Sequence, residues 1–184
     1  MNSAHVRRRR CKLPNSVGAV MILALLGFEP RVLAQYSAPE YEIKAAFLVD
    51  FAQFVKWPAK ALPGGTQPSI GILGEDPFGG ALERIVHGQM TVEHSQRLDD
   101  LKGCQIIFVC KSEKARVDQI LASLQGASIL TVSDVDQFAR KGGVIDFVMD
   151  AGKVRFEINP AAGQRAGLEI RSQLMKLGRI VNSG

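Results

Sequence analysis

Residues 104–132 carry the pattern that decides the fold, and they read CQIIFVCKSEKARVDQILASLQGASILTV. Residues 104–109 and 128–132 are short apolar runs rich in branched side chains, which is typical of buried strands. Between these runs, residues 113–124 place Val117, Ile120, Leu121 and Leu124 on one side of a helix. A strand, a helix and a second strand in this order favour a parallel pair joined by a crossover helix.

The same alternation extends in both directions along the chain. Further strands are predicted at residues 69–73, 90–96, 144–149 and 153–158, and further helices at residues 41–56, 78–86, 134–139 and 170–181. The turn Asp150-Ala-Gly152 is short and favours a hairpin between the last two strands. The sequence therefore predicts an α/β single-domain sandwich: a mostly parallel central sheet of about five to six strands flanked by helices, with a C-terminal β-hairpin and a terminal helix.

The helix predicted at residues 41–56 has one apolar face. Ile43, Phe47, Phe51 and Phe54 recur at helical spacing, with Ala45 and Leu48 widening the stripe, and Glu42, Lys44, Asp50, Gln53 and Lys56 are assigned to the polar side. Ser37 and Glu40 have the spacing of a capping box at the start of this helix. In the terminal helix, the apolar face is predicted to consist of Ile170, Leu174, Leu177 and Val181.

Residues 1–34 have the order of an export signal. A basic segment at residues 7–12 precedes the apolar run VGAVMILALL at residues 17–26, and Val32-Leu-Ala34 forms a small-residue cleavage site. The apolar run is shorter than the ~20 residues that a membrane span needs, so cleavage after about Ala34 is favoured over a retained anchor. The expected organisation is a signal peptide at residues 1–34, one domain at residues 35–184, and a location in the periplasm.

Removal of this segment changes the charge of the protein. The full chain has 23 Lys and Arg residues and 18 Asp and Glu residues, a net charge of +5. Residues 1–34 hold six of those bases and one of those acids, so 17 of each remain and the domain is neutral. A nucleic-acid or membrane-surface role would need a retained basic face, and no block of like charge is left to form one.

Two cysteines remain in the domain, Cys104 and Cys110. They lie at opposite ends of a predicted strand of about 20 Å, whereas a disulfide needs Cα atoms within about 7 Å. Two buried thiols are therefore expected. The alternative is an intermolecular disulfide or another redox role, with Cys110 at an exposed strand end. Neither CxxC nor HxxxH spacing occurs, and no metal site is predicted.

No arrangement of residues in the sequence predicts catalysis. The loop at residues 71–80 is glycine-rich but lacks GxGxxG order and a Walker lysine, and Asp76 is better placed to cap the following helix. Asp134 and Asp136 sit where loops and helix caps favour carboxylates. Asp146 interrupts an apolar strand and is expected on its exposed face. Arg155 and Glu157 form either an ion pair on the sheet or a polar patch for a partner.

Four stretches in order resemble the YfiR family of periplasmic YfiR/HmsC-like proteins. They are residues 40–58 (EYEIKAAFLVDFAQFVKWP), residues 72–79 (ILGEDPFG), residues 104–109 (CQIIFV), and a C-terminal third that contains GGVIDF at residues 142–147, VRFEIN at residues 154–159 and AGLEIRSQLMKL at residues 166–177. The resemblance covers residues 38–181. It implies a non-enzymatic regulator that needs no cofactor and that represses an inner-membrane diguanylate cyclase, an enzyme of cyclic-di-GMP signalling, by protein contact.

The resemblance also implies a functional surface and one departure. Arg155, Glu157 and Asn159 are the expected partner-binding residues, and the partner is the periplasmic sensor domain of the cyclase or a similar protein. A homodimer is also left open, and no nucleic acid is expected. The best-known family member has additional disulfide-forming cysteines that this chain lacks, so redox control is in doubt here. The alternative function is a periplasmic accessory protein that binds a small ligand at the carboxyl ends of the strands.

Overall fold

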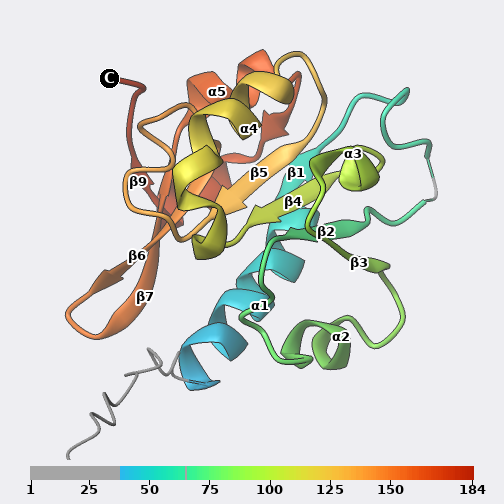
Figure 1. Ribbon diagram of the computed structural model, residues 1–184. Helices are drawn as coiled ribbons and strands as arrows, with labels where there is room; N and C mark the ends of the chain where they lie inside the picture. The colour runs from blue at the N-terminus through green and yellow to red at the C-terminus, as the bar shows by residue number, and fades with distance from the viewer. Residues whose placement is uncertain (1–37, 65) are drawn as a thin grey trace, which may run out of the picture. The chain divides into compact units, whose positions relative to one another are not determined.

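A mostly parallel sheet of seven strands organises the computed structural model, which describes residues 38–64 and 66–184 (Figure 1). The strand order is β3-β2-β4-β5-β6-β7-β9. The strands are β2 (Ile70–Leu73), β3 (Val92–Ser95), β4 (Ile106–Val109), β5 (Leu130–Ser133), β6 (Ile145–Asp150), β7 (Lys153–Ile158) and β9 (Arg179–Ile180). Strands β3, β2, β4, β5 and β6 are mutually parallel, β7 is antiparallel to β6, and β9 is parallel to β7. The predicted α/β fold with its mostly parallel sheet is confirmed.

Helices cover both faces of this sheet. They are α1 (Ala38–Phe54), α2 (Ala81–Val86), α3 (Leu98–Leu101), the 3-10 helix η1 (Lys111–Arg116), α4 (Val117–Ser123), α5 (Pro160–Arg165) and α6 (Ser172–Leu177). A small second sheet pairs β1 (Val55–Lys56) with β8 (Glu169–Ile170). The core on one face includes α1 and α2, and the core on the other includes α3 and α4. No helix among the described residues is long and apolar enough to cross a bilayer.

Helix α1 buries a stripe that is rotated relative to the predicted one. Tyr41, Ala45, Leu48 and Phe51 are buried against the sheet, whereas Ile43 is 47% exposed. Phe51 packs on the hairpin, with its ring centroid 5.7 Å from that of Phe147 and 5.2 Å from that of Phe156. Lys44, assigned to the polar side from the sequence, lies on this buried stripe. Ser37 and the proposed export signal lie outside the described residues.

Three predicted helices are shorter or absent. Residues 134–139 form turns, with Gln137 at a φ of 63°, so the helix predicted there is wrong. The helix predicted from residue 78 begins at Ala81, because Gly79 and Gly80 have left-handed φ angles of 56° and 79°. The terminal helix predicted at residues 170–181 spans only Ser172–Leu177: Ile170 pairs with β1 as part of β8, and after Leu177 the chain continues as β9, whose Arg179 is the register partner of Glu157 in β7. Strand pairing at the sheet edge thus replaces the last predicted helical turn.

The hairpin is formed as the sequence predicts. Asp150 and Lys153 are register partners, and the two residues between them have φ angles of 47° and 74°, as a tight two-residue turn requires. Only two residues of β6 pair with β5, through Val132–Ile145 and Ser133–Asp146. The remaining four residues of β6 extend past the end of β5. The hairpin therefore projects beyond the sheet, as the orange ribbon in Figure 1 shows.

Candidate functional site

The carboxyl ends of the parallel strands form the polar edge of the molecule. Strand β2 lies between β3 and β4, so the chain reverses direction across the sheet at β2, and open α/β sheets bind ligands at such a point. The loops that follow β2 and β4 are in close contact here. Gly74, at a φ of 104°, would place a side-chain Cβ only 2.4 Å from the Ser112 hydroxyl oxygen. No side chain fits between the two loops at this position.

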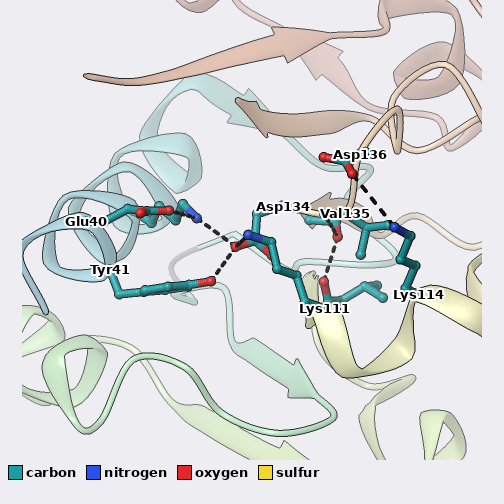
Figure 2. A network of polar contacts seen from close by, with 10 residues as sticks. Glu40, Tyr41, Lys111, Lys114, Asp134, Val135 and Asp136 are labelled. Carbon is teal, nitrogen blue, oxygen red and sulfur yellow. Dashed lines mark hydrogen bonds and ion pairs between the residues drawn. The ribbon is translucent and has the colours of Figure 1, made fainter. Parts of the chain in front are cut away.

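A buried network is centred on Asp134, directly after β5 (Figure 2). The Tyr41 hydroxyl donates to Asp134 Oδ2 at 2.5 Å, and Lys44 Nζ donates to the same oxygen at 2.7 Å. Lys44 is also 2.6 Å from Glu40 Oε1, one helical turn earlier. From the end of β4, Lys111 reaches Asp134 at 3.6 Å. The network therefore connects the start of α1 to the carboxyl ends of two strands that lie far away in the sequence.

Lys44 and Asp134 are almost completely inaccessible to solvent. Each side chain is 2% exposed, and burial of a charge is costly unless it is paired and hydrogen-bonded. Lys44 is satisfied by two carboxylates, and its ammonium also lies 4.2 Å from the ring centroid of Tyr41. Asp134 Oδ1 makes no hydrogen bond to any residue that the structure describes. One oxygen of this carboxylate thus receives all the donors.

A second group of polar side chains forms a row across the face of the sheet opposite α1. By register, Ser133 of β5 lies beside Asp146 of β6, Asp146 beside Glu157 of β7, and Glu157 beside Arg179 of β9. Glu157 is ion-paired with Arg179, and Arg140 Nε is 3.6 Å from its other oxygen. The Ser133 hydroxyl donates to the Val109 carbonyl at 2.7 Å. Three of the four members of this row therefore have partners.

Asp146 is the exception. It is 1% exposed, and neither carboxylate oxygen has a hydrogen bond of normal geometry within the described part of the chain. Burial, and next the charge of Glu157, raise the pKa of Asp146 to about 7, although the backbone N–H groups of Phe138 and Ala139 lie close enough to oppose part of this shift. The expectation that Asp146 lies on an exposed face is wrong, because turns at residues 134–143 cover this face of β6.

The two polar clusters line one groove of about 430 Å³, along the part of β6 that extends past β5. Its lining residues are Glu40, Lys44, Lys111, Asp134, Asp136, Gln137, Arg140, Asp146, Phe147, Val148, Met149, Glu157 and Arg179. The acids at its floor are buried, and the heads of Lys111, Arg140 and Arg179 are 43%, 49% and 69% exposed. The groove thus has a mainly acidic floor, which also holds Lys44, and a mainly basic rim, which also carries the exposed Asp136.

The three residues predicted to bind a partner are in different environments. Arg155 is exposed. Glu157 is 3% exposed and paired with arginines, whereas Asn159 is fully buried. The Asn159 side chain accepts from the Ala162 N–H at 3.0 Å, which caps α5, and donates to the Ala139 carbonyl at 2.8 Å. Only Arg155 can therefore touch another molecule without rearrangement of the strand, and its role in partner binding stays a prediction.

Both cysteines are free and buried, so the prediction of two buried thiols is confirmed. Cys110 is 1% exposed, and the strand end that was expected to be exposed is covered. Burial raises the pKa of both thiols, and the carboxylate of Asp134 adds to the effect at Cys110. A thiol in this state is a poor nucleophile and reacts slowly with oxidants. Among the described residues, no group of three or more His, Cys, Asp and Glu side chains is arranged to hold a metal.

Lys44 and Asp134 are the site residues that the sequence reasoning missed. A signal was present for the first: Lys44 lies three residues after Tyr41 and four before Leu48, on a stripe otherwise occupied by buried apolar side chains. A lysine in that position is rarely buried without a partner. For Asp134 the sequence offered only its place after a buried strand, which loops and caps explain equally well.

Comparisons with known proteins support the fold and the family. A YfiR/HmsC-like family model matches residues 41–179. The search of curated proteins found no match. A conserved domain protein from Vibrio cholerae O1 biovar El Tor has a similar structure, with a TM-score of 0.52 and 11% identity over 76% of this chain and 59% of that one. The ABC domain in complex with L-Trp from Streptococcus pneumoniae has a TM-score of 0.54 and 13% identity over 77% of this chain and 60% of that one.

These structural likenesses concern the fold alone, because the identities are low. This chain spans about three fifths of each of the two solved chains. The family match covers α1 from Tyr41 through the first residue of β9 and therefore includes all groove-lining residues except Glu40.

Proposed function

The chain belongs to the YfiR/HmsC-like family, whose members are periplasmic regulators in cyclic-di-GMP signalling, and we propose that it represses an inner-membrane diguanylate cyclase by direct contact. The repressor binds the periplasmic sensor part of the cyclase and catalyses no reaction itself. The observation that carries this proposal is the family match over residues 41–179, nearly all of the described chain. The export-signal pattern at residues 1–34 would bring the protein to the compartment in which such a sensor is accessible.

The chemistry of the polar edge is compatible with a binding role. Apart from Asp146, its buried charged groups are held by one another, as in a structural network: Lys44 by Glu40 and Asp134, and Glu157 by its arginines. The two thiols are buried, with pKa values raised above the ordinary range. Groups held in this way stabilise a surface, and binding is then carried by exposed side chains around them, such as Arg155.

Deletion of the gene tests the proposal. We expect cyclic-di-GMP to rise in the deletion strain and to return to its original level when the full chain is supplied again. Chemical crosslinking in intact cells should recover a membrane protein with a periplasmic sensor and a cyclase domain. An unchanged cyclic-di-GMP level, together with no such membrane protein among the crosslinked products, would contradict the proposal.

A pair of variants tests whether Arg155 belongs to the partner-binding surface. Arg155→Ala should weaken repression, because Arg155 is exposed on the hairpin. Arg97→Ala is the matched control: Arg97 is also exposed but lies just before α3, next to the strand at the opposite edge of the sheet. Equal cyclic-di-GMP levels in the two variant strains would remove Arg155 from the proposed surface and leave the repressor proposal intact.

A second candidate function is small-ligand binding. It is favoured by the groove at the carboxyl edge of the sheet, which is lined in part by residues that follow β4 and β5. A ligand that binds only the folded state raises its stability, by about 2.7 kcal/mol at a concentration one hundred times its dissociation constant. A thermal-shift screen with amino acids and nucleotides is therefore decisive: a saturable shift supports this candidate, and the absence of any shift counts against it.

A further inference from the structure

The groove beside β6 has the backbone geometry of a docking site for an extended chain. Asn159 N–H donates to the Val144 carbonyl at 2.9 Å, which places the backbone groups of Val144 on the β7 side. Successive residues of a strand alternate, so Asp146 and Val148 also face β7, whereas Phe147 and Met149 direct their N–H and C=O groups away from it. Strand β5 ends at Ser133, and no strand of the described chain pairs with β6 beyond Asp146 on that side.

This free edge opens onto the groove. Phe147, Val148 and Met149 all line it, and Met149 is 52% exposed. An unpaired strand edge recruits an extended peptide through main-chain hydrogen bonds, and proteins usually cover or charge such edges when they are not used. Here the edge carries an exposed methionine, a flexible apolar side chain that is common at binding surfaces.

One of the three buried carboxyl groups at the floor of the groove has no cationic partner. Asp134 has Lys44 at 2.7 Å and Lys111 at 3.6 Å. Glu157 has Arg179 and Arg140. Asp146, between them in the row, has no basic group within ion-pair distance in the described ranges, and it lies beside the Glu157 carboxylate in the register. A buried carboxylate without a cationic partner is unfavourable unless it is protonated or a partner protein supplies the missing charge.

We propose that an extended segment of a partner protein pairs with the free edge of β6 at Phe147 and Met149 and directs a lysine or arginine side chain towards Asp146. A residue of that segment opposite Val148 lies on the same face of the sheet as Asp146 and diagonal to it, within the reach of a long basic side chain. The exposed heads of Lys111 and Arg140 favour acidic residues next to that basic residue. The inference rests on the proposed function insofar as both require a protein partner.

A site-specific photo-crosslinking residue at position 149 of the full chain, in its own cells, tests the inference. We expect a crosslinked peptide with a lysine or arginine within about two residues of the labelled position, identified by mass spectrometry. The matched control places the same probe at Ile180, which is 49% exposed in β9, next to β7 on the side away from β6. No peptide at position 149, an adduct of a small molecule, a labelled peptide without a basic residue, or equal labelling at Ile180 would overturn the proposal.

Two substitutions test the role of the Asp146 carboxylate separately from that of the unpaired edge of β6. Asp146→Asn should lower the crosslinking yield at position 149 by at least about tenfold, because loss of one member of a buried charge pair is costly. The variant removes an unpaired buried carboxyl group, so its thermal midpoint should not fall, and a yield that stays unchanged overturns the role of Asp146. Met149→Pro, with the probe moved to Asp150, removes an N–H that faces away from β7 and should abolish crosslinking while the hairpin is retained.

Cyclic-di-GMP measured in the same strains distinguishes the two proposals. A crosslinked partner together with a level that does not respond to gene deletion supports the groove and contradicts the cyclase assignment. A level that rises on deletion but is unaffected by Asp146→Asn and Met149→Pro, without a crosslink at position 149, supports repression and contradicts the groove.

Discussion

Asp134, directly after β5, and Asp146, in the neighbouring strand β6, are two buried carboxyl groups with opposite environments. Asp134 receives a tyrosine hydroxyl and a buried lysine on one oxygen, whereas Asp146 receives no well-formed hydrogen bond on either oxygen from the described residues. Both are almost inaccessible to solvent. Two similarly buried carboxyl groups therefore differ in the donors that surround them. On the α1 side of the groove the buried carboxylate has cationic partners, and on the side that carries Asp146 it has none.

Among the substitutions that test this comparison, Lys44→Met is expected to have the largest effect on the free energy of unfolding. Removal of the buried cation leaves Asp134 with the half-exposed Lys111 and should lower the free energy of unfolding by about 3–5 kcal/mol. Urea unfolding of the purified domain measures the change. The double variant Lys44→Met with Asp134→Leu should recover much of the loss, because both charges are then gone. Lys56→Ala is the control, since its pair with Glu169 is on the surface and should contribute less than about 1 kcal/mol.

Asp146 should make the stability fall as the pH rises. Its pKa is raised to about 7 in the folded state, so between the unfolded value near 4 and pH 7 the folded protein keeps a proton that the unfolded chain loses. The full stability is thus present below about pH 4 and is lost progressively up to about pH 7. Between pH 5 and pH 8 we expect a loss of about 2–3 kcal/mol from this group. A similar slope in Asp146→Asn would show that other groups cause it.

Tyr41→Phe tests the neutral donor of the Asp134 network. The substitution removes the hydroxyl that donates at 2.5 Å and keeps the ring, whose centroid is 5.5 Å from that of Phe78. A hydrogen bond to a charged group contributes about 1.5–3 kcal/mol, and we expect a loss near the lower limit because Lys44 and Lys111 remain. Unfolding in urea at pH 7 gives the value, and a loss of less than about 0.5 kcal/mol would show that the hydroxyl contributes little.

The smallest effect is expected from Arg155→Ala on the hairpin. The side chain is exposed and forms no ion pair with any residue that the structure describes, so stability should change by less than about 0.5 kcal/mol. Thermal unfolding checks this value. A clearly larger loss would assign Arg155 a structural role and weaken the interpretation of its effect on partner binding.

The sequence predicted the strands more accurately than the functional edge. Apolar runs located β4, β5, β6 and β7 to within about two residues, because a buried strand is specified by its own side chains. The end of the chain was predicted less well: apolar residues at helical spacing continued to Val181, but pairing of Arg179 with β7 decides the structure there. Local periodicity contains no information about that pairing.

The polar edge depends on contacts that no local pattern contains. Lys44 and Asp134 meet across 90 residues, and neither has a sequence neighbour that indicates the other. Asp146 shows a related limit of prediction from local sequence. Its strand was predicted, but its burial depends on turns at residues 134–143, and residues 134–139 of this segment were expected to form a helix. The parts of the site that could be predicted were therefore its elements, and the parts that could not were its charge pairs.

The position of α1 has a consequence for how the chain acquires its structure. The helix is the first described element, yet the rings of Phe47 and Phe51 are covered by Phe147 and Phe156, about one hundred residues later. Contacts between such distant residues form slowly, and a chain that emerges from its N-terminus exposes this aromatic helix until the hairpin has followed. The contacts of these two rings with the hairpin therefore form only after the hairpin has been made, and until then the exposed rings of the helix are a natural target for a chaperone.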